Sequence, residues 1–123
     1  MEHSISLSSD GRYILLKVKG DITRELAMKF NIESHAIGRD HGINKYLVDM
    51  TESRNVDSVT DNYDFAYKDM RETPEVDRSA RVALLVSPND HSHDFVETVA
   101  KNTGLDVTIF RDRTQAVSHL LRD

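Results

Sequence analysis

The sequence predicts a single α/β domain built on a mostly parallel sheet. After an initial pair of strands, strand-like and helix-like segments alternate along the chain, and helical crossovers make the strands that they join parallel. The apolar run VALLV at 82–86 is typical of a strand covered on both faces. A length of 123 residues with 38% hydrophobic residues fits one core. We therefore predict that residues 1–123 form one domain, in which an N-terminal antiparallel edge strand precedes four parallel strands that alternate with four helices.

The N-terminal third is predicted to hold two strands and a helix. Apolar stretches at 5–7 and 13–18 flank the loop SSDG, whose Asp-Gly pair suits a hairpin turn. The apolar spacing then lengthens to that of a helix, for which Thr23 is the predicted N-cap and Gly38 the predicted end. The apolar stripe of this helix consists of Leu26, Phe30 and Ile37.

The rest of the chain repeats a strand-then-helix order. Residues 43–50 are strand-like, a helix follows that ends before Pro74, and 94–104 and 105–110 are predicted as a helix and a strand beyond the strand at 82–86. Asp112 is the predicted cap of a last helix. Apolar residues at helical spacing in the second and last helices are Val59, Tyr63, Ala66, Met70, Ala116, Val117, Leu120 and Leu121.

The charge is uneven along the chain. The net charge is -5, and the stretch from Asp49 to Arg78 contains nine acidic and four basic residues, so the whole excess lies there. An acidic surface repels phosphate backbones, so we expect no nucleic-acid partner and, if the partner is charged, a cationic one. The alternative, which we favour, is a solvated acidic helix without a partner. No apolar run reaches spanning length and the N-terminus lacks a signal peptide, which predicts a cytoplasmic protein without a transmembrane segment.

Four acids lie at or just after the predicted parallel strands: Asp21, Asp49, Asp90 and Asp112. Carboxylates that converge at one sheet edge could bind a metal ion or perform acid-base chemistry. Helix N-termini gather at the same edge, however, and aspartate is a favoured cap there. We favour capping, because each helix start explains its own acid.

The stretch PNDHSHDF adds His91 and His93 to this edge, between Asp90 and Asp94. A His-x-His pair can ligate a metal, so Asp90, His91 and His93 are weak metal candidates. The favoured alternative makes Asp90 or Ser92 the cap of the next helix and leaves both imidazoles exposed.

No stretch carries a catalytic motif. The sequence has no nucleophile elbow, no phosphate-binding glycine-rich loop and no His-Glu-x-x-His, and it has no cysteine. We therefore predict a protein that is not an enzyme and needs no cofactor. His119 is expected on the partly exposed side of the last helix.

Ser58 has two interpretations. Ser58 and Asp61 follow the capping-box pattern, in which the hydroxyl caps the helix and the carboxylate three residues on reciprocates. A serine at a helix start is also a workable phosphosite, because the phosphate gains from the positive helix end. Capping alone suffices to explain the residue.

The segment VDMTESRNVDS resembles the strand, loop and Asp-Ser segment of STAS domains, the fold of bacterial anti-sigma-factor antagonists. Asp49 and Asp57 keep the family's spacing, and VAKNTGLDVTIFRDRTQAVSHLL resembles the family's C-terminal part. The resemblance implies that Ser58 is phosphorylated by a partner kinase that is also an anti-sigma factor. It implies a partner surface of Asp49, Asp57, Ser58 and Asp61. Val59 and Thr60 depart from the family, which usually has a small residue and then glycine there.

The Arg111-Asp112 pair and RVALLV look more like an uncharacterised bacterial branch of SpoIIAA-like proteins, related to Sec14-type (CRAL-TRIO) lipid-binding domains. This resemblance implies the fold, and it implies that no serine acts as a phosphorylation switch. The kinship raises a second possibility, a pocket for a small apolar or lipid-like ligand at Tyr63, Phe65 and Tyr67, although these aromatics could equally pack the core.

Three hypotheses follow, in order of preference. The first is a non-enzymatic regulatory or protein-interaction module that works through the helix beginning at Ser58. The second is a protein that binds a small apolar or amphipathic ligand. The third is a metal-dependent enzyme that uses Asp21, Asp49, Asp90 and the two histidines. Exposed aromatics and an edge strand also suggest a homodimer.

Overall fold

The computed structural model describes residues 2–122 and contains one sheet of five strands in the order β1-β2-β3-β4-β5. β1 (Glu2–Leu7) pairs antiparallel with β2 (Ile14–Ile22), whereas β3 (Lys45–Asn55), β4 (Arg81–Leu85) and β5 (Asp106–Phe110) continue the sheet in parallel. The predicted antiparallel edge strand followed by four parallel strands is confirmed.

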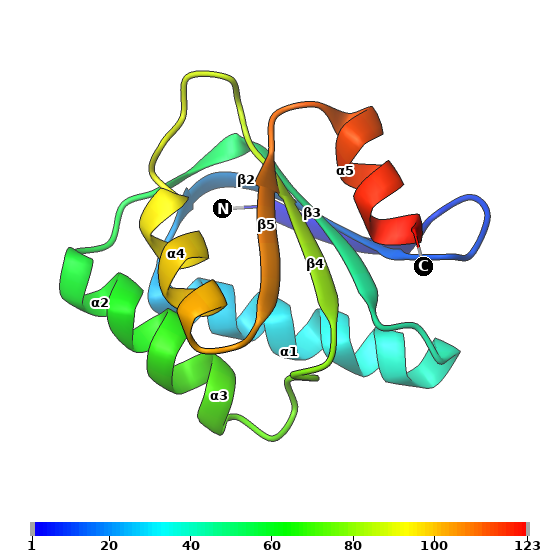
Figure 1. Ribbon diagram of the computed structural model, residues 1–123, viewed down its shortest axis with the longest axis horizontal. Helices are drawn as coiled ribbons and strands as arrows, with labels where there is room; N and C mark the ends of the chain where they lie inside the picture. The colour runs from blue at the N-terminus through cyan, green and yellow to red at the C-terminus, as the bar shows by residue number, and fades with distance from the viewer. Residues whose placement is uncertain (1, 123) are drawn as a thin grey trace.

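The helices cover the two faces of the sheet unequally (Figure 1). They are α1 (Arg24–His41), α2 (Val59–Tyr63), η1 (Asp64–Asp69), α3 (Met70–Glu72), α4 (Asp94–Asn102) and α5 (Arg113–Leu121). Since the strands lie in chain order, crossovers of one hand all fall on the same face. α1, α2, η1, α3 and α4 accordingly cover what we call the helix-rich face, and α5 alone covers the other, the α5 face.

Each face has its own apolar core. On the helix-rich face, Phe30 of α1, Ala66 of η1 and Val99 of α4 are buried against the strands. On the α5 face, Ala116 and Leu120 of α5 are buried against the sheet. Residues of the two strand faces alternate because successive side chains of a strand point to opposite sides.

α1 begins as predicted and ends later than predicted. The Thr23 hydroxyl caps it by accepting a bond from the Leu26 N–H, but the helix continues past Gly38 to His41 and ends at Gly42, whose φ of 67° is left-handed. Gly38 is needed for space instead: a Cβ there would lie 2.0 Å from the Tyr46 hydroxyl oxygen. The prediction of Gly38 as a stop was wrong because helix propensity cannot reveal a close tertiary contact.

β3 is also longer than predicted, since 51–55 form strand and not loop. Its register against β2 shifts between Lys17 and Lys19, where the bulge places an extra β3 residue. As a result Glu52 lies beside Lys17 on the α5 face, while Ser53 turns toward the helix-rich face, where it neighbours His93. The bulge thus decides which polar side chains enter the helix-rich layer.

The second predicted helix is one helical segment with a π-helical middle. It follows Ser58 and ends at Glu72, before Pro74, as predicted. η1, with its wider π turns, occupies Asp64–Asp69 between α2 and α3. Such π segments are rare and frequently occur at functional sites. Here the segment covers the helix-rich face beside α4.

Candidate functional site

Asp57 and Ser58 lie where two helices begin. The Asp57 carboxylate accepts a hydrogen bond from the backbone N–H of Arg24, the first residue of α1. The Ser58 hydroxyl caps α2 and accepts from the Asp61 N–H at 3.1 Å. Both contacts satisfy N–H groups that a helix start leaves free. This dipeptide therefore fixes the start of α1 relative to the start of α2.

Arg24 gathers the acidic side chains of the second helical segment. Its guanidinium forms two bonds to Asp69, at 2.6 and 2.9 Å, and lies 3.5 Å from Asp64 and 3.9 Å from Asp61. The bond to Asp69, followed by the other nearby carboxylates, raises the pKa of Arg24 above its usual value. Asp61 thus faces Arg24. No local pattern could predict this cluster, because its basic member lies on a different helix.

Asp49 is separate from this group. It lies on the α5 face, 5% exposed, where it accepts a bond from the Thr51 hydroxyl at 2.7 Å and lies 3.6 Å from the Arg113 guanidinium of α5. Ser58 begins a helix on the other face. The predicted partner surface of Asp49, Asp57, Ser58 and Asp61 is therefore wrong in its first member. The other three lie together.

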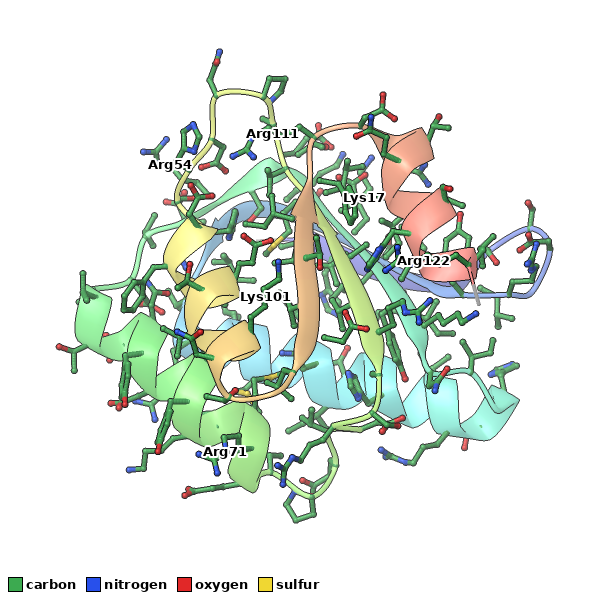
Figure 2. The ribbon with its side chains drawn as sticks, in the orientation of Figure 1. Lys17, Arg54, Arg71, Lys101, Arg111 and Arg122 are labelled. Carbon is green, nitrogen blue, oxygen red and sulfur yellow. The ribbon has the colours of Figure 1, made fainter. Side chains whose placement is uncertain are left out.

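Exposed apolar side chains follow Ser58 along the outer side of the segment. Val59 is 68% exposed, and Tyr63 and Tyr67 are exposed and stack with their ring centroids 5.2 Å apart. Arg71 extends the row, 4.9 Å from the Tyr67 ring centroid, at the end of α3 in Figure 2. We call the exposed residues Val56, Ser58, Val59, Tyr63 and Tyr67 the interaction face. Tyr63 and Tyr67 do not line the interior, which corrects the predicted ligand pocket.

Phe65, the third aromatic of that prediction, lines a partly open cavity of about 90 Å³ between the sheet and the helix-rich layer. Most of the wall is apolar and comes from β2, β3, β4, α1, η1 and α4. Polar groups gather where the strands end and α1 and α2 begin. The polar lining residues are Thr23, Arg24, Asn31, Asn55, Asp57, Asn62 and His93.

His93 is the most unusual of these polar residues. It is 4% exposed, and its Nε2 atom has no hydrogen-bond partner among the described residues. The Asp90 carboxylate lies 3.6 Å away, beyond hydrogen-bond distance. Burial lowers the pKa of His93, an effect that Asp90 and a bond to the Ser53 backbone oppose in part. His93 is therefore a neutral imidazole at neutral pH, with one nitrogen unsatisfied.

The surroundings of His93 differ from those predicted. His93 itself occupies the N-cap position of α4, without a capping bond. Ser92, one of the predicted caps, instead accepts a bond from the Asn55 N–H at 3.0 Å, and Asp90 accepts from the Ser92 N–H at 2.8 Å. The expected exposure of both imidazoles is wrong for His93. It could not be foreseen, because the extension of β3 brings Asn55 and Ser53 to this loop.

His91 points elsewhere and is 69% exposed in its side chain. Its Nδ1 atom lies 2.8 Å from Asp94 and 3.2 Å from the Arg111 guanidinium. Arg111 and Arg54 are both labelled near this loop in Figure 2. No three His, Asp or Glu side chains within residues 2–122 are placed to hold a metal ion. The candidates Asp90, His91 and His93 are therefore not brought together as a ligand set.

The remaining polar candidates have separate places in the fold. Asp21 is exposed near the end of β2, and Asp112 caps α5 by accepting from the Gln115 N–H at 3.0 Å, as predicted. His119 packs against Phe110 with 14% of its side chain exposed, which agrees with a partly exposed position. Asp49, Asp90 and Asp112 thus each serve a separate local structure, whereas Asp21 is exposed.

Comparisons with known proteins identify the fold. No family model matches the sequence, and no curated protein matches it. An uncharacterised DUF3478-family protein with a SpoIIAA-like fold from Shewanella loihica aligns over 97% of this chain and 92% of its own, with a TM-score of 0.56 and 22% identity. A STAS-domain antisigma-factor antagonist from Rhodobacter sphaeroides aligns over 88% and 83%, with a TM-score of 0.35 and 14% identity, too low to support an argument.

The first of these similarities shows that the chain has a SpoIIAA-like fold, as the sequence resemblance implied. The fold alone assigns no activity. The implied relation to Sec14-type domains stays a prediction. Among residues 2–122, none of the helices combines the length and the apolar character needed to cross a membrane.

Proposed function

We propose that this chain is a non-enzymatic protein-interaction module that contacts its partner through the interaction face. The observation that carries the proposal is the row of exposed apolar side chains beside Ser58, with Val59 the most exposed. Contiguous exposed apolar groups typically mark interaction sites, and tyrosine is enriched at the centre of interfaces.

The surroundings of Ser58 support regulation of this contact by phosphorylation. Ser58 is exposed, and it lies between Asp57 and Asp61. A phosphate would add nearly two negative charges to a surface that is already acidic. The guanidinium of Arg24, which lies 3.9 Å from Asp61, is already bonded to Asp69. Phosphorylation by a kinase partner would therefore place an unpaired dianion beside the exposed apolar side chains of the interaction face, and the cost of burying that charge would release the partner.

The roles of the strand-end acids support a non-enzymatic module. Asp49 is bonded to Thr51 and paired with Arg113, Asp112 caps α5, and Asp90 accepts a backbone bond within its own loop. Each carboxylate serves a local structure and is held apart from the others.

The proposal can be tested by affinity capture from the native cytoplasm with quantitative mass spectrometry. The baits are the wild-type protein and the variants Ser58→Ala, Ser58→Asp and Tyr63→Ala. We expect one partner to be retained by wild type and Ser58→Ala and to fall at least about tenfold with Ser58→Asp and Tyr63→Ala, a loss expected of the few central residues that dominate an interface.

Ser118→Asp is the matched control, because Ser118 is an exposed serine on α5, across the sheet from Ser58. It adds the same charge without touching the interaction face. Identical partner lists for Ser58→Asp, Tyr63→Ala and Ser118→Asp would refute the proposal.

A further inference from the structure

We propose that the partly open cavity binds a small, uncharged molecule with an apolar body and one hydroxyl group, and that this hydroxyl bonds to the Nε2 atom of His93. The site is distinct from the interaction face and does not depend on the proposed function. It rests on two observations: a cavity of about 90 Å³ and a buried imidazole nitrogen without a partner.

The cavity is too large and too apolar to be explained as a packing flaw or a water site. Interiors are normally close-packed, and one water needs only about 10–15 Å³ of such space. On the sheet side the wall of the cavity consists of Leu16, Val18 and Val48. On the opposite side, α4 contributes Val96 and Ala100. Walls of this kind favour an apolar body over a group of waters.

His93 supplies the polar recognition. A buried polar atom without a partner costs free energy, and a ligand that bonds to it recovers that cost. A hydroxyl can donate and accept, so it satisfies Nε2 whichever ring nitrogen carries the proton. A few polar side chains in a mostly apolar lining match the usual design of small-molecule pockets.

The charges around the cavity select an uncharged ligand. Asp57 lines it and Asp90 lies 3.6 Å from His93, so an anion would meet carboxylates. Arg24, the cation at the lining, is committed to Asp69. A cationic ligand would have to leave water for walls that are mostly apolar.

The polar end of the cavity also provides an entrance. Thr23, Asn55, Asp57 and Asn62 line it and are each partly exposed. Asn55 and Asn62 are bonded to each other at 2.6 Å, which links β3 to α2 at this point. A ligand would enter between the starts of α1 and α2, with its hydroxyl toward His93.

The test compares phenol with toluene, two probes of similar shape that differ in the hydroxyl. Binding is measured by calorimetry and by ¹H–¹⁵N spectra of the full chain. We expect phenol to bind at least as tightly as toluene and to shift the His93 Nε2 resonance. A purely apolar cavity would bind toluene more tightly than phenol, because phenol would lose its hydrogen bonds to water without compensation.

Two variants complete the test. In His93→Phe, phenol affinity should fall about five- to tenfold, because the phenol hydroxyl loses its one hydrogen bond, while toluene affinity stays within about twofold. In Ala100→Leu, which fills the cavity, both probes should cease to bind. Circular dichroism confirms that each variant is folded.

Three results would overturn the proposal: toluene binding without phenol binding, phenol binding that His93→Phe leaves unchanged, or no binding of either probe to the wild-type protein. Benzoate serves as the charged comparison, and tighter binding of benzoate than of phenol would contradict the choice of an uncharged ligand. None of these results bears on partner capture through Ser58, so the two proposals fail separately.

Discussion

Two histidines are buried in the helix-rich layer, and their surroundings differ. His35, on α1, is 2% exposed and stacks on Tyr46 with ring centroids 4.4 Å apart, and its Nδ1 atom accepts a bond from the Asp77 N–H at 2.8 Å. His93, on the loop before α4, is 4% exposed, lines a cavity and leaves Nε2 unsatisfied. His35 is therefore packed within the core, whereas His93 borders a cavity.

The difference shows that burial of a polar residue does not by itself indicate a binding site. One turn along α1 from His35 the packing is so close that a Cβ at Gly38 would clash with Tyr46. Around His93 there is empty volume and an unused nitrogen. The combination of a void and an unsatisfied group is what distinguishes a site from a packed interior.

The largest expected effect is acid destabilisation through His35. Burial lowers the pKa of His35 from 6.5 to about 4. Because the folded state binds the proton less readily than the unfolded state, the stability that neutral His35 provides is complete above pH 6.5 and is lost as the pH falls toward 4. The free energy of unfolding should drop by about 3 kcal/mol over this range, as measured by urea titration at successive pH values.

His35→Phe is the control for this pH effect. It keeps a flat ring against Tyr46 but removes the acceptor for the Asp77 N–H, so it should cost about 1–3 kcal/mol at pH 7. It should also flatten the decline between pH 6.5 and 4. A decline of unchanged size in this variant would assign the acid sensitivity to other groups, such as His93.

Gly38→Ala tests how tightly the His35 end is packed. The added Cβ would lie 2.0 Å from the Tyr46 hydroxyl and 2.7 Å from the backbone oxygen of Ile43, so the structure must shift. We expect a loss of about 1–3 kcal/mol in the free energy of unfolding despite the better helix propensity of alanine. Gly38→Ala combined with Tyr46→Phe removes the nearer clash and should recover part of the loss. A stabilising Gly38→Ala would contradict the close packing.

The sequence predicted what depends on local pattern and missed what depends on tertiary contact. Periodicity predicted which segments form strands and helices but not the order of the strands in the sheet. Thr23, Ser58 and Asp112 were found as caps because a cap bonds within its own first turn. Arg24 was missed because its partners lie more than thirty residues away. His93 was misplaced because a bulge in β3, invisible to periodicity, determines what reaches its loop.

Ser58→Ala has a smaller expected effect, on the end of the layer where α2 begins. The variant removes the acceptor for the Asp61 N–H and should lower the free energy of unfolding by about 1 kcal/mol. Ser58→Asp should leave stability nearly unchanged, because aspartate caps equally well. Thermal unfolding of the two variants measures this difference. Equal stability of Ser58→Ala and wild type would mean that the hydroxyl does not cap α2 in solution.

The smallest expected effect is that of His93→Phe, made to match His35→Phe. The change removes a nitrogen that has no partner, and the gain from that removal offsets the loss of the bond to the Ser53 backbone. We expect the free energy of unfolding at pH 7 to change by less than about 1 kcal/mol, against a clear loss for His35→Phe. Urea unfolding of the two variants under the same conditions makes the comparison. If His93→Phe costs as much as His35→Phe, then Nε2 has a partner in solution, and the contrast between the packed and the open end of the layer disappears. A near-neutral result would mean that His93 is kept for something other than stability, as a ligand-binding residue requires.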